Sequence, residues 1–376
     1  MKIVAKKLWT NHGFESDAVI EIQDGIVTDI SHGDQGDFAC DIAAPGLIDQ
    51  HVHGGFGVTV MHSGPDDMLK WLGFLLKNGV TQVLSGVYTA PIPVMRQALA
   101  VARDVMRRQT AGAGGAMLAG VHLEGPFISM QALGAMDAES VIAPTIANYE
   151  VLADGYEDII RLVTVAPEVE GAHELIHYLT ERGIHVQAGH TAATDAQGRE
   201  AFCAGVRGIT HFFNASTPIR HRAPGILAQA LLEDDVYCEC ICDFVHVHDT
   251  CVKLIYRCKG SRRMIIVSDA VETTGLPDGI YEFGGATSIV TDGESRTLAG
   301  SLNGGSTTPL GEIRNLVDAG IPLWDALCMA SRTPADFLGI EGGSIAISQR
   351  AEIVCLSDGL QPLLTVRGQV MAEGEQ

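Results

Sequence analysis

Eight apolar runs with strand character alternate along the middle of the chain with patterns that predict helices. Residues 65–79 illustrate a helix, because apolar residues recur there at positions 68, 69, 72, 75 and 76. The eight runs are PGLIDQHVH, GVTQVLSG, GAMLAGVHLEG, IIRLVTVAPE, HVQAGHT, GITHFFN, YCECICDFVH and MIIVSDA. Eight β-α units make up a (β/α)8 TIM-like barrel, which typically takes about 250 residues. We therefore expect an α/β fold, with this barrel over residues 45–345.

Short strand patterns occupy both ends of the chain. KIVAKKLWT and AVIEIQDGIVTDIS lie near the N-terminus, and QDG at residues 23–25 is typical of a hairpin turn. AEIVCLSD and LLTVRGQVMAEG lie near the C-terminus and have the same character. We therefore expect residues 1–44 and 346–376 to form one small, discontinuous β-sandwich domain beside the barrel.

Six of the apolar runs end in polar residues that could take part in chemistry. They are His51 and His53, Glu124, His190, His211 with Asn214, His246, and Asp269. The active sites of such barrels lie at the carboxyl ends of the strands, so these side chains should converge. His51 and His53 also leave their strand on the same face, because strand residues at i and i+2 point the same way.

Imidazole and carboxylate are ligands that bind Zn²⁺ or a similar divalent ion while leaving a position open. One or two ions are possible here, with Zn the first expectation and Fe or Mn as alternatives. Such an ion lowers the pKa of bound water to about 7. Asp269 is placed to accept a proton from that water and to donate it later to a leaving group. The pattern thus favours a metal-dependent hydrolase.

The composition excludes several other classes of function. The 376 residues carry a net charge of −21, and such a surface repels nucleic acids and anionic membranes. The first residues lack the apolar core of a signal peptide, and no run approaches the ~20 apolar residues of a membrane span. Nine cysteines are scattered without a disulfide pattern. We expect a cytoplasmic protein with reduced thiols that acts on a small molecule.

Six stretches of the chain resemble the amidohydrolase superfamily, and more narrowly its N-acetylglucosamine-6-phosphate and N-acetylgalactosamine-6-phosphate deacetylases. They are PGLIDQHVHGG, HLEGPFIS, AGHT, THFFNAS, SDAVETTG and LAGS. The resemblance implies a homodimer that releases acetate from an N-acetylhexosamine 6-phosphate. N-acetylglucosamine 6-phosphate is the first expectation and N-acetylgalactosamine 6-phosphate the second.

The same resemblance implies a ligand set for the metal. Glu124, His190 and His211 correspond to the ligands of the main ion. His51 and His53 correspond to positions that hold a second ion in some members of the family. Many binuclear amidohydrolases bridge their ions with a carboxylated lysine after the fourth strand. Here the fourth run ends in VTVAPE, without a lysine, so the Glu124 carboxylate would take the bridging place.

Roles toward the substrate are implied in the same way. Asp269 corresponds to the catalytic base and acid, and His246 to a residue that polarises the acetyl carbonyl or binds the sugar. Asn214 and Ala215 follow the sixth strand, where the family holds the phosphate. Arg222 corresponds to an arginine that reaches the neighbouring subunit's site across the dimer interface.

One segment departs from the family pattern. Residues 133–136 read LGAM where these deacetylases usually carry KGAH, so Met136 replaces a histidine that contacts the substrate. A thioether is at best a weak hydrogen-bond acceptor. Two alternatives therefore stay open. The chain could be an amidohydrolase for another N-acyl substrate, such as an N-acyl amino acid, or a catalytically silent metal-binding barrel. The presence of Asp269 argues against the silent barrel.

Overall fold

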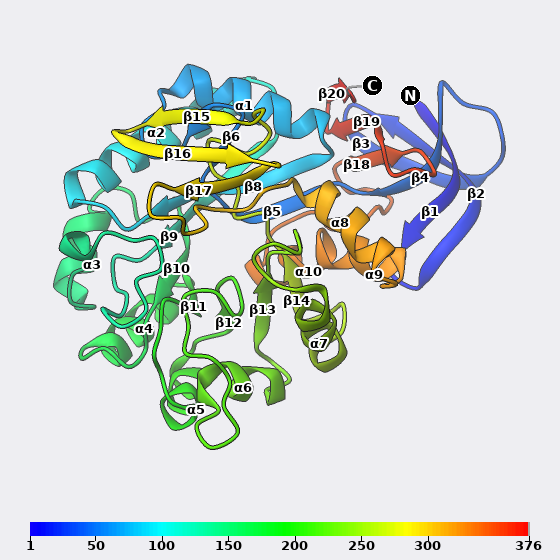
Figure 1. The fold of residues 1–376 in the computed structure, drawn as a ribbon. Helices are drawn as coiled ribbons and strands as arrows, with labels where there is room; N and C mark the ends of the chain where they lie inside the picture. The colour runs from blue at the N-terminus through cyan, green and yellow to red at the C-terminus, as the bar shows by residue number, and fades with distance from the viewer. Residues whose placement is uncertain (375–376) are drawn as a thin grey trace.

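A computed structural model describes residues 1–374 and has an eight-stranded sheet at its centre (Figure 1). The strands follow one another in chain order across the sheet, and each pairs in parallel with the next. They are β5 (Leu47–Val52), β8 (Val80–Tyr88), β9 (Met117–Glu124), β10 (Ile160–Val165), β11 (His185–Ala188), β12 (Gly208–Ile209), β13 (Tyr237–Cys240) and β14 (Met264–Ile266). All eight predicted strands are present, and the barrel fold is confirmed.

The segment after β14 lies against β5 and joins the last strand to the first. The Asp269 amide donates to the carbonyl of His51 at 2.9 Å, and the His53 amide donates to the carbonyl of Ala270 at 2.8 Å. These bonds bring the two ends of the sheet together, so that the side chains following β14 lie beside those of β5. Most apolar residues of the strands and the surrounding helices form one continuous core, and a smaller cluster includes Leu84, Leu162 and Ile265.

Helices follow most of the barrel strands and cover them. The predicted helix over 65–79 is present and ends slightly earlier, before Gly79, which has a φ of +87°. The helices are α1 (Pro65–Lys77), α2 (Ile92–Thr110), η1 (Ala138–Ser140), α3 (Ile146–Ala153), α4 (Ala172–Glu181), α5 (Asp195–Ala204), α6 (Gly225–Leu232), α7 (Asp249–Lys259), α8 (Pro309–Asp318), α9 (Leu323–Met329) and α10 (Arg332–Leu338). Among residues 1–374, none of the helices has the length and apolar character that a membrane crossing demands.

Strands from both ends of the chain form a second, seven-stranded sheet, here called the terminal sheet (Figure 1). Its order is β20-β19-β18-β4-β1-β2-β3, and the antiparallel pair of β18 and β4 joins the two ends of the chain. Its strands are β1 (Lys2–Thr10), β2 (Gly13–Gln23), β3 (Ile26–His32), β4 (Phe38–Pro45), β18 (Glu352–Leu356), β19 (Pro362–Arg367) and β20 (Val370–Glu373). The terminal sheet has an apolar core of its own. The domain limits at 44/45 and 345/346 stay predictions.

A three-stranded antiparallel sheet follows β14 and was not predicted from the sequence. It consists of β15 (Gly279–Phe283), β16 (Ala286–Thr291) and β17 (Glu294–Thr297), drawn in yellow in Figure 1. Most of its side chains are exposed or half-buried, so it lacks the apolar run that marks the other strands. A short hairpin of β6 (Gly54–Gly55) and β7 (Val58–Thr59) follows β5.

Candidate active site

The two histidines at the end of β5 point toward one another, as their spacing predicts. Their Nε2 atoms lie 3.1 Å apart, and both side chains are buried. His51 is the penultimate residue of the strand, and His53 directly follows it. The backbone after them turns away through the glycine pair of β6, where a side chain at Gly54 would collide with the carbonyl of Val58 at 2.1 Å.

The carboxylate of Glu124, the last residue of β9, lies among four imidazoles. Its Oε1 is 3.1 Å from His190 Nε2 and 3.0 Å from His211 Nε2. On its other side, Oε1 is 3.4 Å from His51 Nε2 and Oε2 is 3.3 Å from His53 Nε2. Two groups of three potential ligands thus share Glu124, one with His51 and His53 and one with His190 and His211.

The outer nitrogens of three imidazoles are already engaged by the protein. Nδ1 of His53 donates to the carbonyl of Gly86 at 2.8 Å, and Nδ1 of His190 donates to the carbonyl of Leu133 at 3.1 Å. Nδ1 of His51 donates to Glu239 at 3.1 Å. With the ring proton on Nδ1, the lone pair of Nε2 is directed into the site, which is how metal-ligating histidines are commonly held. The donor set therefore fits a divalent metal ion.

The backbone has an unusual conformation at three of the residues that follow the strands. His190, His211 and Asp269 have φ values of +46°, +30° and +47°. Such conformations cost on the order of 1–3 kcal/mol each and tend to occur at functional sites. His190 and His211 lie two residues after the ends of β11 and β12, and Asp269 lies three residues after the end of β14.

Opposite charges dominate the electrostatics of the site. Burial disfavours the charged form of His51, but Asp269 and Glu124 outweigh burial and hold the pKa of His51 well above its usual value. Burial likewise opposes ionisation of Glu124, but His51 and the hydrogen bonds from His190 and His211 hold its pKa well below its usual value. A divalent cation bound at Nε2 would displace the extra proton of His51 and would then pair with the same carboxylates.

Asp269 completes the cluster from the end of β14. Its Oδ1 lies 3.1 Å from His53 Nε2 and 3.5 Å from His51 Nε2. Burial disfavours its ionised form, but the charges of His51 and His53 outweigh burial and lower the pKa of Asp269. An ionised carboxylate beside a metal site is able to accept a proton from water.

Comparison with known proteins agrees with this geometry. The model of the amidohydrolase family matches residues 42–371. The chain belongs to the amidohydrolase family. It is 34% identical over 372 residues to an N-acetylgalactosamine-6-phosphate deacetylase of Escherichia coli O157:H7. The match covers 97% of this chain and 98% of that relative. It is 35% identical over 316 residues to an N-acetylglucosamine-6-phosphate deacetylase of Vibrio furnissii, covering 83% and 78%.

Solved structures of similar proteins share the whole fold. A variant of the Mycobacterium smegmatis N-acetyl-D-glucosamine-6-phosphate deacetylase, in complex with N-acetyl-D-glucosamine-6-phosphate, has a TM-score of 0.91 and 28% identity, covering 99% of this chain and 98% of that one. The deacetylase of Thermotoga maritima has a TM-score of 0.89 and 29% identity, covering 99% of both chains. The resemblance inferred from the sequence motifs is therefore confirmed.

A cavity of about 550 Å³ opens above the potential metal ligands of this amidohydrolase, within the range of small-molecule sites. Asn214, Ala215 and His246, three of the four predicted substrate residues, line it, and so does Met136. The unpredicted three-stranded sheet supplies Phe283, Ala286 and Thr297 to the same wall. That sheet thus forms part of the cavity wall.

Arg222 takes a different position. It lies in the exposed stretch between β12 and α6 and is not among the residues that line this cavity in the described part of the chain. Its predicted role, reaching a neighbouring subunit's site, stays a prediction.

His246 faces the cavity and is held by Asp243, three residues before it. Nδ1 of His246 donates to Asp243 Oδ2 at 2.8 Å, while Asp243 Oδ1 accepts from the backbone amides of Val245 and His246 at 2.9 Å. Ser306, in the glycine-rich NGGST stretch, also donates to Asp243 Oδ2 at 3.2 Å. Asp243 therefore connects the segment after β13 with the NGGST stretch, of which Asn303 and Gly304 line the cavity.

Two buried carboxylates near the site were missed by sequence reasoning. Glu239 lies within β13 and holds His51, while Gln50 donates to it at 2.7 Å. Asp243 lies near the end of the seventh predicted run, YCECICDFVH, as the predicted residues do in theirs, and this position was a signal that could have found it. Glu239 lies inside the apolar run CECIC and gave no such signal.

We predict that Glu124→Gln removes most of the bound metal, because this carboxylate is common to both groups of ligands. His53→Asn should remove at most one ion, the one expected beside His51 and His53. Elemental analysis of the purified variants against wild type measures both effects. The exposed Glu282→Gln serves as the matched control. Wild-type metal content in the Glu124→Gln variant would contradict the assignment of a shared ligand.

Proposed function

We propose that this amidohydrolase removes the N-acetyl group from N-acetylhexosamine 6-phosphates, with N-acetylglucosamine 6-phosphate as its main substrate. The observation that carries the proposal is the cluster of Glu124, four imidazoles and Asp269 at the base of a substrate-sized cavity. The substrate class comes from relatives whose names state deacetylation of N-acetylated hexosamine 6-phosphates, one of which covers 97% of this chain.

The metal is proposed to be one or two Zn ions, with Fe or Mn as alternatives. Glu124, His190 and His211 would hold one ion, and His51 and His53 together with Glu124 a second. A divalent ion bound there supplies Lewis-acid chemistry that polarises a carbonyl and activates water.

Asp269 moves the proton in the proposed reaction. Its lowered pKa leaves the carboxylate ionised, so it accepts a proton from the water that attacks the acetyl carbon. The same proton is then delivered to the nitrogen of the sugar as the C–N bond breaks. The products are acetate and the amino-sugar phosphate.

His246 stabilises charge on the acetyl oxygen in this proposal. Burial disfavours its charged form, but the hydrogen bond and charge of Asp243 outweigh burial and raise the pKa of His246. With Nδ1 bound to Asp243, the protonated ring has Nε2–H free to donate toward the cavity. A donor aimed at a developing oxyanion lowers the barrier of acyl transfer.

The phosphate group is proposed to bind beside Asn214 and Ala215, with Arg222 supplied by the second subunit of a homodimer. The guanidinium fork of an arginine matches the geometry of phosphate oxygens. A cytoplasmic site of action is proposed because all nine cysteines are free, with six of them buried.

N-acetylgalactosamine 6-phosphate is the second candidate substrate. Met136 lines the cavity where the family usually has a histidine, and a relative named for the galactosamine substrate matches almost the entire chain. An N-acyl amino acid is less favoured, because the relatives that match most of the chain are named for sugar phosphates.

We predict acetate release from both phosphorylated N-acetylhexosamines, with the higher kcat/KM for the glucosamine derivative. Unphosphorylated N-acetylglucosamine and N-acetyl amino acids are the controls and should react far more slowly, because they lack the phosphate that positions the acetyl group. Preference for an N-acyl amino acid would refute the proposed substrate class. Absence of turnover by the metal-loaded protein on every substrate would favour the silent barrel.

We predict that Asp269→Asn retains metal and lowers kcat by about 10²–10⁴-fold, the range expected for loss of a general acid–base group. The amide keeps the shape of the side chain but cannot take the proton. Steady-state kinetics and elemental analysis on the same preparation separate the two effects. The matched control is Asp318→Asn at the end of α8, outside the cavity lining. Near-normal turnover by Asp269→Asn would exclude its role.

A subunit-mixing experiment tests Arg222. Arg222→Ala and Asp269→Asn are each expected to be nearly inactive, but a hybrid dimer of the two contains one complete site if Arg222 acts on its neighbour. Random mixing of the subunits should then restore roughly a quarter of wild-type activity, since half of the dimers are hybrids with one of two sites intact. Failure to restore activity in verified hybrids would place Arg222 in its own subunit's site or outside the reaction.

A further inference from the structure

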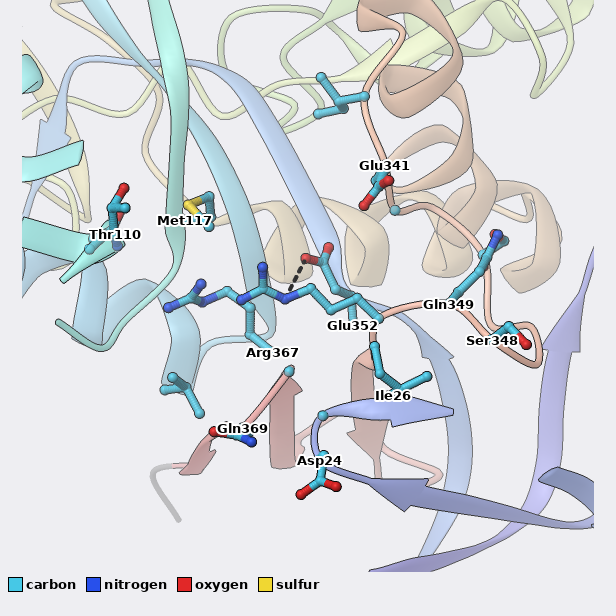
Figure 2. Close-up of a pocket in the computed structure, with 18 of the residues that line it drawn as sticks. Asp24, Ile26, Thr110, Met117, Glu341, Ser348, Gln349, Glu352, Arg367 and Gln369 are labelled. Atoms are coloured by element: carbon cyan, nitrogen blue, oxygen red, sulfur yellow. Dashed lines mark hydrogen bonds and ion pairs between the residues drawn. The ribbon is translucent and has the colours of Figure 1, made fainter. Parts of the chain in front are cut away.

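A second cavity, of about 970 Å³, lies at the opposite end of the barrel, between the barrel and the terminal sheet (Figure 2). Met117, the first residue of β9, and Thr110, the last residue of α2, line its barrel side. Asp24 and Gln369 line it from turns of the terminal sheet. β9 therefore runs from this cavity to Glu124 in the metal site. Its length, at roughly 3.3 Å per residue, separates the two places by about 23 Å.

The guanidinium of Arg367 lies inside this cavity with little compensation for its charge (Figure 2). Arg367 is 3% exposed, and its Nε donates to the carbonyl of Gly115 at 2.6 Å. Residues 1–374 offer no hydrogen-bond acceptor to its two Nη atoms and no carboxylate within ion-pair distance. A buried charge in this state is costly unless something else pairs with it.

A second guanidinium, that of Arg350, adds to the positive charge. It packs over the turn next to Arg367, where a Cβ on Gly368 would come within 2.9 Å of Arg350 Nε. Burial and then the charge of Arg350 lower the pKa of Arg367. The nearest acid, Glu352, lies 4.0 Å from Arg350 Nε and already accepts a hydrogen bond from Gln82 at 2.7 Å. Among residues 1–374, Glu352 is thus the one acid within ion-pair distance of either guanidinium group.

We propose that this cavity binds a small hydroxylated metabolite through its phosphate or carboxylate group, which lies between Arg350 and Arg367. Guanidinium forks match the oxygens of either anion, and the anion supplies the acceptors that the Nη atoms of Arg367 lack. Glu341 and Asp24 on the exposed rim are able to accept hydrogen bonds from hydroxyl groups on the rest of the ligand. The volume suits a ligand of this size.

Hydrogen exchange measured by mass spectrometry locates the binding. The metal-loaded protein is compared with and without inorganic phosphate, glucose 6-phosphate or gluconate, at constant ionic strength set with chloride. We expect slower exchange in residues 109–117, 341–350 and 366–370. Protection by both phosphates alone identifies a phosphate site, and protection by gluconate alone identifies a carboxylate site. Protection limited to the catalytic cavity, or absent with all three probes, overturns the proposal.

Two variants test the arginine pair directly. Arg350→Gln removes a half-exposed charge, and Arg367→Lys keeps the buried charge but removes the fork. Each should raise the Kd of the best probe at least tenfold, while any protection near the catalytic cavity stays unchanged. Arg332→Gln is the matched control, because Arg332 lines the same cavity but is already paired with Asp336 at 2.8 Å. An unchanged Kd in the folded Arg350→Gln and Arg367→Lys variants refutes the assignment.

Discussion

The carboxylate of Glu124 is the feature on which the catalytic end of this barrel depends. It is 2% exposed, and such a buried charge is tolerated only when it is paired and hydrogen-bonded. Imidazoles from three other strand ends provide that pairing within 3.4 Å. Without the shared carboxylate, two pairs of imidazoles would face each other with no acceptor between them. The ligand geometry follows from this arrangement, and two of the same imidazoles, His51 and His53, lower the pKa of Asp269.

The sequence predicted this end of the barrel well for a physical reason. In parallel barrels, the carboxyl ends of all strands meet on one face, so residues far apart in the chain converge if each follows a strand. His190 and His211 illustrate the point, since β11 and β12 are only four and two residues long, yet the position after the strand was sufficient. The prediction depends only on the position of each residue after its strand, and not on how many residues separate the strands in the sequence.

Other parts could not be predicted because they depend on contacts between distant segments. Glu239 holds His51 across 188 positions and lies within an apolar run, where its carboxylate has no visible partner in the sequence. β15–β17 are short and polar, and their pairing gives no apolar alternation, although they form one wall of the substrate cavity. The arginine pair at the other end of the barrel is also invisible, because Arg350 and Arg367 belong to no motif and face a cavity built from separated segments.

The loop that carries Met136 shows how substrate preference can change without loss of the metal site. This loop holds His190 through the backbone carbonyls of Ala132 and Leu133, each 3.1 Å from Nδ1, and not through any side chain. Gly134 follows with a φ of +61°, and a Cβ there would lie 3.2 Å from the ring of His190. A side chain at position 134 would therefore crowd His190. The hydrogen bonds to His190 come from the backbone and do not depend on which side chains stand at positions 133 and 136. Met136, in place of the family's usual histidine, thus changes the lining of the cavity while the backbone carbonyls that hold His190 stay in place.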